Sequence, residues 1–178
     1  MAFNINEVQA NFRFEGARAT LFTVDIFNPV NSDADNSIRF LASATSIPES
    51  DLGNIPVPYF GRVINFAGDR TYPAWNVTVM NDENFAIRNA MEEWSDAINK
   101  RVQNVRSEVN YKSIARVTQL SKTGEILRVY RFNGIYPASI SDIRLDWSDT
   151  NTFERFGIQF IYDYWDIESG VTGNAGGV

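Results

Sequence analysis

The sequence contains no cysteine and no histidine. The absence of cysteine excludes disulfide bonds, thiolate nucleophiles and iron–sulfur clusters held by thiolates. The absence of histidine removes the commonest general acid–base, the Ser-His-Asp arrangement and the commonest ligand of transition metals. Carboxylate or lysine chemistry stays open, but the two absences together argue against an enzyme.

Long apolar runs and an excess of positive charge are missing as well. No stretch approaches the roughly 18 consecutive apolar residues of a transmembrane helix. Residues 1–7 lack the basic and apolar regions of a secretory signal, so a protein made in the cytoplasm is the expectation. The chain carries 16 Lys and Arg against 22 Asp and Glu, a formal net charge of −6. Sequence-independent binding of nucleic acid needs a cationic surface, so the composition argues against that class.

The residues that are present are typical of one mostly-β domain. A chain of 178 residues suffices for a single core, and aromatic residues make up 13% of it, which favours strands. Alternation of apolar and polar residues predicts strands at 20–27, 37–46, 59–66, 74–81, 113–120, 125–132, 139–147 and 156–165. Turn-forming residues predict loops at 28–36, 67–70, 121–124 and 133–134, and prolines predict a long connection or sheet edge at 47–58.

One helix is expected after the strand at 74–81. Asn81 or Asp82 is its expected N-cap. Spacings of three and four place one apolar set on a single helix face: Ile87, Met91, Trp94 and Ile98. The predicted fold class is therefore mostly β, a small sandwich or barrel with one flanking α-helix.

Two groups of carboxylates are candidates for a hydrolytic site. They are Asp142, Asp146, Asp149 and Glu154, and Asp163, Asp166 and Glu168. A glycosidase needs a pair of carboxylates flanking a cleft, and exposed Trp147 and Trp165 would suit a saccharide. A solvated acidic surface explains the same residues more simply. We expect no catalytic residue.

Two further patterns also have a plain structural explanation. Arg128 and Arg131 could form a nucleic-acid patch, but charges at a strand edge explain them better in an acidic chain. Asp33 and Asp35 have the alternate spacing of a calcium loop, but Ile38 stands where such a loop needs glycine. We expect neither a metal nor a cofactor.

Three stretches, in their order and spacing, are similar to one known family. They are Ala44–Pro48, Ile64–Glu83 with its Ala67-Gly68-Asp69-Arg70-Thr71 segment, and Leu145–Ser148 followed by the closing Tyr162–Trp165. From about residue 20 to residue 165, the chain resembles the tail tube protein of contractile-tailed bacteriophages.

The resemblance implies a structural virion protein and no enzymatic activity. Members of that family form hexameric rings that stack into a tube inside a contractile sheath, with baseplate and tail-terminator proteins at its ends. The genome passes transiently through the lumen. The implied place is the virion tail, after assembly in the host cytoplasm. Residues 1–168 would form the tube domain with an N-terminal arm, and residues 169–178 a flexible Gly-rich tail.

The resemblance also implies a contact between rings, through the connection from Ile47 to about Arg70. The expected contact residues are Pro48, Glu49, Asp51, Pro56, Tyr59, Arg62, Asp69 and Arg70. Proline lowers the ordering cost of a docking loop. Deletion of Glu49–Ile55 is therefore expected to leave a folded domain that cannot elongate into tubes.

The acidic composition predicts a lumen that does not grip DNA. Six copies carry a formal charge of −36, since each copy carries −6. A cationic wall would hold the phosphates, whereas an acidic wall lets DNA slide. Two alternatives stay open: a baseplate or tail-terminator component on the same fold, and a carbohydrate-binding or hydrolytic β-domain.

Overall fold

The structure is a computed structural model that describes residues 5, 10–12, 16–105 and 110–173. In chain order its elements are β1 (Phe22–Ile26), α2 (Asp35–Leu41), β2 (Ala42–Thr45), β3 (Asp51–Tyr59), β4 (Arg62–Thr71), β5 (Trp75–Met80), α3 (Ala86–Ile98), β6 (Ser113–Leu120), β7 (Ile126–Ile140), β8 (Arg155–Ile161) and β9 (Tyr164–Ser169). The mostly-β class is confirmed. No helix among the described residues is long and apolar enough to cross a membrane.

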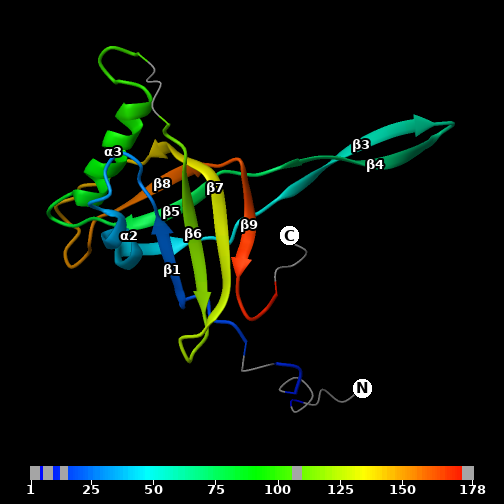
Figure 1. The fold of residues 1–178 in the computed structure, drawn as a ribbon, viewed down its shortest axis with the longest axis horizontal. Helices are drawn as coiled ribbons and strands as arrows, with labels where there is room; N and C mark the ends of the chain where they lie inside the picture. The colour runs from blue at the N-terminus through cyan, green and yellow to red at the C-terminus, as the bar shows by residue number, and fades with distance from the viewer. Residues whose placement is uncertain (1–4, 6–9, 13–15, 106–109, 174–178) are drawn as a thin grey trace.

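The strands form a sandwich-like body in which β7 belongs to both layers. The hydrogen-bonded order is β1-β6-β7-β8-β5-β2, with β9 added to β7, and every pairing is antiparallel. The first half of β7 pairs with β6 and β9, and its last residues pair with β8. The helices α2 and α3 pack beside this body, whereas β3 and β4 form a separate two-stranded ribbon that extends away from it (Figure 1).

The core lies between the two layers and under α3. Trp75 of β5 stacks on Phe132 of β7, with ring centroids 4.3 Å apart, and both side chains are buried. Phe160 of β8 contacts both Trp75 and the α3 residue Trp94. The indole of Trp94 donates to the Tyr111 carbonyl at 2.9 Å, so its polar atom is satisfied although the ring is buried.

The strand predicted at 37–46 is wrong over its first half. Residues Asp35–Leu41 form α2, and only Ala42–Thr45 form a strand. A strand would place Ile38 and Phe40 on one face, yet Ile38 is fully buried while Phe40 is 79% exposed. In the helical conformation Ala34, Ile38 and Leu41 recur at spacings of four and three, so their side chains lie on one side and pack against the core.

The helix at 87–98 is confirmed, but its predicted cap is wrong. Ile87, Met91 and Trp94 are buried and Ile98 packs against the core. The helix begins at Ala86, and its N-cap is Phe85 in the left-handed conformation with φ 51° and no side-chain cap. Asp82 instead accepts the Phe85 backbone N–H at its carbonyl, in a turn before the helix.

The predicted turn at Asn133–Gly134 is a β-bulge inside β7. Ser113 pairs with Ile135 and Ile114 pairs with Asn133, so Gly134 is the extra residue. Gly134 has φ 68°, which glycine adopts without a steric penalty. Consequently β7 continues to Ile140, and the strand predicted at 139–147 is limited to its first two residues.

The strand predicted at 156–165 is two strands. Phe156, Ile158 and Phe160 are buried as expected, but β8 ends at Ile161 and β9 begins at Tyr164. The chain crosses from one layer to the other between them. Tyr164 is 48% exposed, and Trp165 packs against the core in its place.

The ends of the chain are described only in part. Most of the expected arm at residues 1–18 and the last five residues of the expected Gly-rich tail lie outside the described residues. Within the described part, Thr172 accepts from the Arg128 side chain at 3.0 Å and donates to the Leu127 carbonyl at 2.9 Å. These bonds hold the start of the tail against β7.

Candidate assembly interface

The β3–β4 ribbon corrects the prediction for residues 47–70. The predicted connection at 47–58 and the predicted turn at 67–70 both lie largely in strands, and the turn is Phe60–Gly61. Tyr59 pairs with Arg62 across it, and Phe60 and Gly61 have φ 40° and 78°. Two successive positive φ values are what a two-residue type I′ hairpin turn requires, and this turn matches the natural twist of two paired strands.

The ribbon has one apolar face. Ile55 lies opposite Phe66 and Val57 lies opposite Ile64, and residues paired directly across two strands point to the same side. Tyr59 continues this face toward the tip. The apolar face of the ribbon is thus Ile55, Val57, Tyr59, Ile64 and Phe66, with exposed fractions between 41% and 63%.

The other face of the ribbon is more polar. It carries Asn54, Asn65 and the two prolines Pro56 and Pro58, and Asn54 donates to the Asn65 side chain at 3.0 Å. Val63 also lies on this face and is 60% exposed. The ribbon is therefore amphipathic, although no described part of the chain covers its apolar face. Since an isolated two-stranded ribbon is at best marginally stable in water, this face is suited to contact with another surface.

The base of the ribbon is tied to the body. The Trp75 indole donates to the Ser46 carbonyl at 3.0 Å, and the Trp165 indole donates to the Glu49 carbonyl at 3.1 Å. Above this base, Gly53 and Gly68 approach so closely that a Cβ built on Gly68 would lie 3.1 Å from the Gly53 carbonyl carbon. Glycine at 68, in the segment that carries the family resemblance, lies at a bulge where a side chain would force the two backbones apart by a few tenths of an ångström.

The predicted contact residues divide into two sets. Asp51, Pro56, Tyr59, Arg62, Asp69 and Arg70 lie on the ribbon and are exposed. Pro48 is buried, and Glu49 fixes the ribbon base through its carbonyl. Sequence reasoning missed Ile55, Val57, Ile64 and Phe66, although their period-two spacing was the signal that could have revealed an apolar ribbon face.

The carboxylates at 163–168 are engaged in ion pairs with cations of β6, β7 and the segment before β6. Lys112 pairs with Asp163 at 2.7 Å, Arg131 with Asp166 at 2.7 Å, and Arg116 with Glu168 at 2.6 Å. The hydrogen bond from Arg116 holds the pKa of Glu168 below its ordinary value. Arg131 is therefore neutralised within the chain, and the described residues contain no cluster suited to hold a metal ion.

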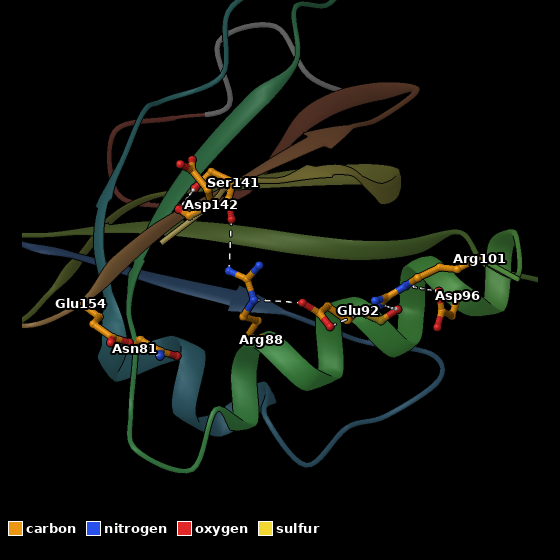
Figure 2. A network of polar contacts seen from close by, with 8 residues as sticks. All are labelled: Asn81, Arg88, Glu92, Asp96, Arg101, Ser141, Asp142 and Glu154. Atoms are coloured by element: carbon orange, nitrogen blue, oxygen red, sulfur yellow. Dashed lines mark hydrogen bonds and ion pairs between the residues drawn. The ribbon is translucent and has the colours of Figure 1, made fainter. Parts of the chain in front are cut away.

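The carboxylates at 142–154 lie apart from these, in the loop between β7 and β8. Figure 2 shows how its two ends are held against the body: Arg88 of α3 donates to the Ser141 carbonyl at 3.1 Å, and Asn81 donates to Glu154 at 2.8 Å. Arg88 also pairs with Glu92, at 2.9 Å. The two groups of carboxylates therefore lie apart, and within the 142–154 group the Glu154 side chain holds one end of the loop.

Comparison with known proteins identifies the family. The family model described as phage tail tube protein matches residues 3–168. The chain belongs to the phage tail tube protein family. Tail tube protein gp19 of Enterobacteria phage T4 is 31% identical over 153 residues, covering 84% of this chain and 91% of gp19. The tail tube protein of Serratia phage KSP90 is 28% identical, over 74% of this chain and 76% of that protein.

Solved structures agree on the fold of this tail tube protein. The anti-feeding prophage tube-terminating cap superimposes with a TM-score of 0.66 at 17% identity, covering 87% of this chain and 92% of the cap protein. A chain of the PVC sheath–tube complex in its extended state gives 0.53 at 13% identity, covering 94% and 99%. The role of the tail tube protein is structural, as a part of the phage tail.

Proposed function

We propose that copies of this tail tube protein form rings of six, that these rings stack into the inner tube of the tail, and that the apolar face of the β3–β4 ribbon makes the contact between rings. A sheath would surround the tube, and baseplate and terminator proteins would lie at its ends. The observation that carries the proposal is an amphipathic ribbon that extends from the body with its apolar face uncovered by the described residues.

Burial of this face would contribute several kcal/mol to the free energy of association. A large apolar side chain contributes about 1.5–3 kcal/mol when fully buried, and the five residues of this face are about half exposed. Their burial against a neighbour would contribute roughly 5 kcal/mol before the costs of association.

The test compares two neighbouring residues on opposite faces of the ribbon. Ile64→Thr removes apolar surface from the proposed contact, and Val63→Thr makes the same kind of change on the other face. Threonine keeps β-propensity, so both variants keep the ribbon. A deletion such as Glu49–Ile55 would also remove the acceptor of Trp165 and more than half of β3, and is less specific.

The expected result is that wild-type and Val63→Thr proteins form hollow tubes in negative-stain electron microscopy, with a baseplate complex added where nucleation needs one. Ile64→Thr protein would form no tubes, and its sedimentation coefficient would not exceed that of a single ring. Equal tube formation by both variants would show that the apolar face is not the contact. Wild-type rings that never stack would favour the baseplate or terminator alternative, which makes one ring and stops.

We also propose that DNA passes through this tube without binding to its wall. The chain has a net charge of −6, and Lys112, Arg116 and Arg131 are paired with carboxylates. A wall with a net negative charge repels the phosphates and therefore binds DNA weakly. Tubes should not retain duplex DNA in filter binding at 50 mM salt; retention that falls steeply with salt would contradict this.

A further inference from the structure

The loop of residues 141–154, between β7 and β8, presents a second uncovered apolar surface. Trp147 is fully exposed, and Leu145 and Phe153 are each 79% exposed. Soluble domains rarely gather three large apolar side chains on one exposed loop unless the loop meets a partner. Tryptophan is also the residue most enriched among those that dominate binding energy at protein interfaces.

The loop is ordered around Asp146 before any partner binds. One carboxylate oxygen of Asp146 accepts from the Ser148 backbone N–H at 3.0 Å and from the Ser148 hydroxyl at 2.6 Å. Arg144 donates to the other oxygen at 2.7 Å, and these bonds hold the pKa of Asp146 below its ordinary value. With its ends anchored by Arg88 and Asn81, the loop holds Trp147 outward at little entropic cost on binding.

The loop and the ribbon lie at opposite ends of β5. The ribbon ends at Thr71, shortly before β5 begins at Trp75. At the other end of β5, Met80 pairs with Arg155, the residue that directly follows the loop. A copy therefore carries an uncovered ribbon at one end of this layer and an uncovered loop at the other, which suits a head-to-tail contact between copies.

The charge of the loop is opposite to that of the ribbon tip, although the ribbon as a whole is neutral because Asp51 and Asp69 balance Arg62 and Arg70. Within residues 141–154 there are four carboxylates and one arginine, a formal charge of −3. Asp142 and Asp149 are exposed, and no described residue forms an ion pair with either. On the ribbon, Arg62 at the tip and Arg70 near the base are exposed and likewise have no described ion-pair partner.

We propose that the 141–154 loop of one copy is the docking surface for the β3–β4 ribbon of the next copy. Trp147 packs on the apolar face of the ribbon, while Arg62 faces Asp149. This assignment rests on the proposed function, because it names the surface that covers the ribbon. The contact is heterologous, so it continues into a closed ring or an open helix and never ends in a symmetric dimer.

The decisive experiment mixes two defective proteins. Ile64→Thr removes apolar surface from the ribbon and keeps the loop intact, whereas Trp147→Ser removes apolar surface from the loop and keeps the ribbon intact. We expect neither variant alone to form tubes, with the protein concentration needed for tube assembly raised at least about 30-fold. An equimolar mixture of rings of the two variants has one intact set of ribbon–loop contacts per pair of rings and should give paired rings that do not grow.

Val102→Ser is the matched control, because Val102 is 97% exposed on a different connection. It should assemble as wild type, as should a protein in which Arg62→Asp and Asp149→Arg restore the charge pair that each change breaks alone. Near-ultraviolet circular dichroism verifies that every variant stays folded.

The outcomes separate the two proposals. If Ile64→Thr blocks assembly but Trp147→Ser protein assembles as wild type, the loop assignment is overturned and the proposed function stands. If both variants are blocked but the mixture gives only unpaired rings, ribbon and loop do not meet each other, and the loop assignment again fails. If neither variant is blocked, both proposals fail.

Discussion

The indole Nε1 of Trp165 donates a hydrogen bond to the backbone carbonyl of Glu49 at 3.1 Å. This bond joins β9, the last strand, to the connection that leads into the ribbon. Trp75 makes the equivalent bond to Ser46 at 3.0 Å. Two tryptophans of the body therefore fix the segment from which the ribbon extends, so the direction of the ribbon depends on side chains distant in sequence.

Replacing Trp165 by phenylalanine should loosen the ribbon base without unfolding the body. The change removes the donor to Glu49 but keeps an aromatic ring against Tyr130, 5.9 Å away between ring centroids. We expect a loss of about 0.5–1.5 kcal/mol in the free energy of unfolding, typical for one hydrogen bond. Amide hydrogen exchange should accelerate at residues 47–52. Unchanged exchange there would show that Trp165 does not hold the base.

Truncating Phe132 should destabilise the whole domain. Phe132 is fully buried between Trp75 and Tyr162, with ring centroids 4.3 Å and 4.9 Å away. Phe132→Ala removes these contacts and leaves a cavity, at an expected cost of about 3–5 kcal/mol. Urea unfolding of the monomer measures it. Ile126→Ala on the same strand is the control, since Ile126 is 47% exposed and should cost far less.

The ion pair between Arg116 and Glu168 predicts a loss of stability in acid. The pKa of Glu168 is lowered below its ordinary value of 4.5, chiefly by the hydrogen bond from Arg116. A carboxyl whose pKa is lowered by folding stabilises the protein above its ordinary value, and this stabilisation is lost as pH falls through the folded-state value. The pair is partly exposed, so its contribution is about 1 kcal/mol or less.

Glu168→Gln tests this pair directly. At pH 7 the variant should unfold at a lower urea concentration than wild type, and the difference should shrink as the pH falls below 4.5. Glu125→Gln, in the exposed turn before β7, serves as the control. A difference that persists unchanged at pH 3 would mean that Glu168 acts through packing and not through its charge.

The elements that sequence reasoning predicted well are those with an uninterrupted period over one buried face. In β5, Trp75, Val77 and Val79 alternate and all three are buried. The β6–β7 hairpin and α3 have similarly regular apolar faces. The strand predicted at 37–41 was wrong because a short apolar run fits both the period of a strand and the period of a helix. The contacts of Ile38 with the core favour the helix.

The ribbon and the loop were harder to predict, because their apolar residues are not buried in the chain itself. Phe60–Gly61 lacks the Asn-Gly signal of a two-residue hairpin. Sequence reasoning therefore predicts the turn at residues 67–70, where Gly68 forms the bulge. Sequence reasoning expected both Trp147 and Trp165 to be exposed, which is correct for Trp147 and wrong for Trp165, since Trp165 packs against the core. Surfaces that are completed by another copy are visible only once the fold is known.

The conformation of Phe60 yields the last prediction. Phe60 has φ 40° at the ribbon tip and is 92% exposed, so an unfavourable backbone conformation is combined with an uncovered aromatic ring. Asparagine tolerates positive φ far better than phenylalanine, and Asn-Gly is a preferred pair for a type I′ turn. Phe60→Asn should therefore stabilise the isolated ribbon by a few tenths of a kcal/mol to about 1 kcal/mol and slow amide exchange in β3 and β4.

The same variant tests whether the Phe60 side chain contacts a neighbouring copy. If it does, Phe60→Asn protein should form tubes less readily than wild type, measured by the protein concentration at which tubes appear. Better tube formation by Phe60→Asn would mean that the ribbon tip contributes shape alone.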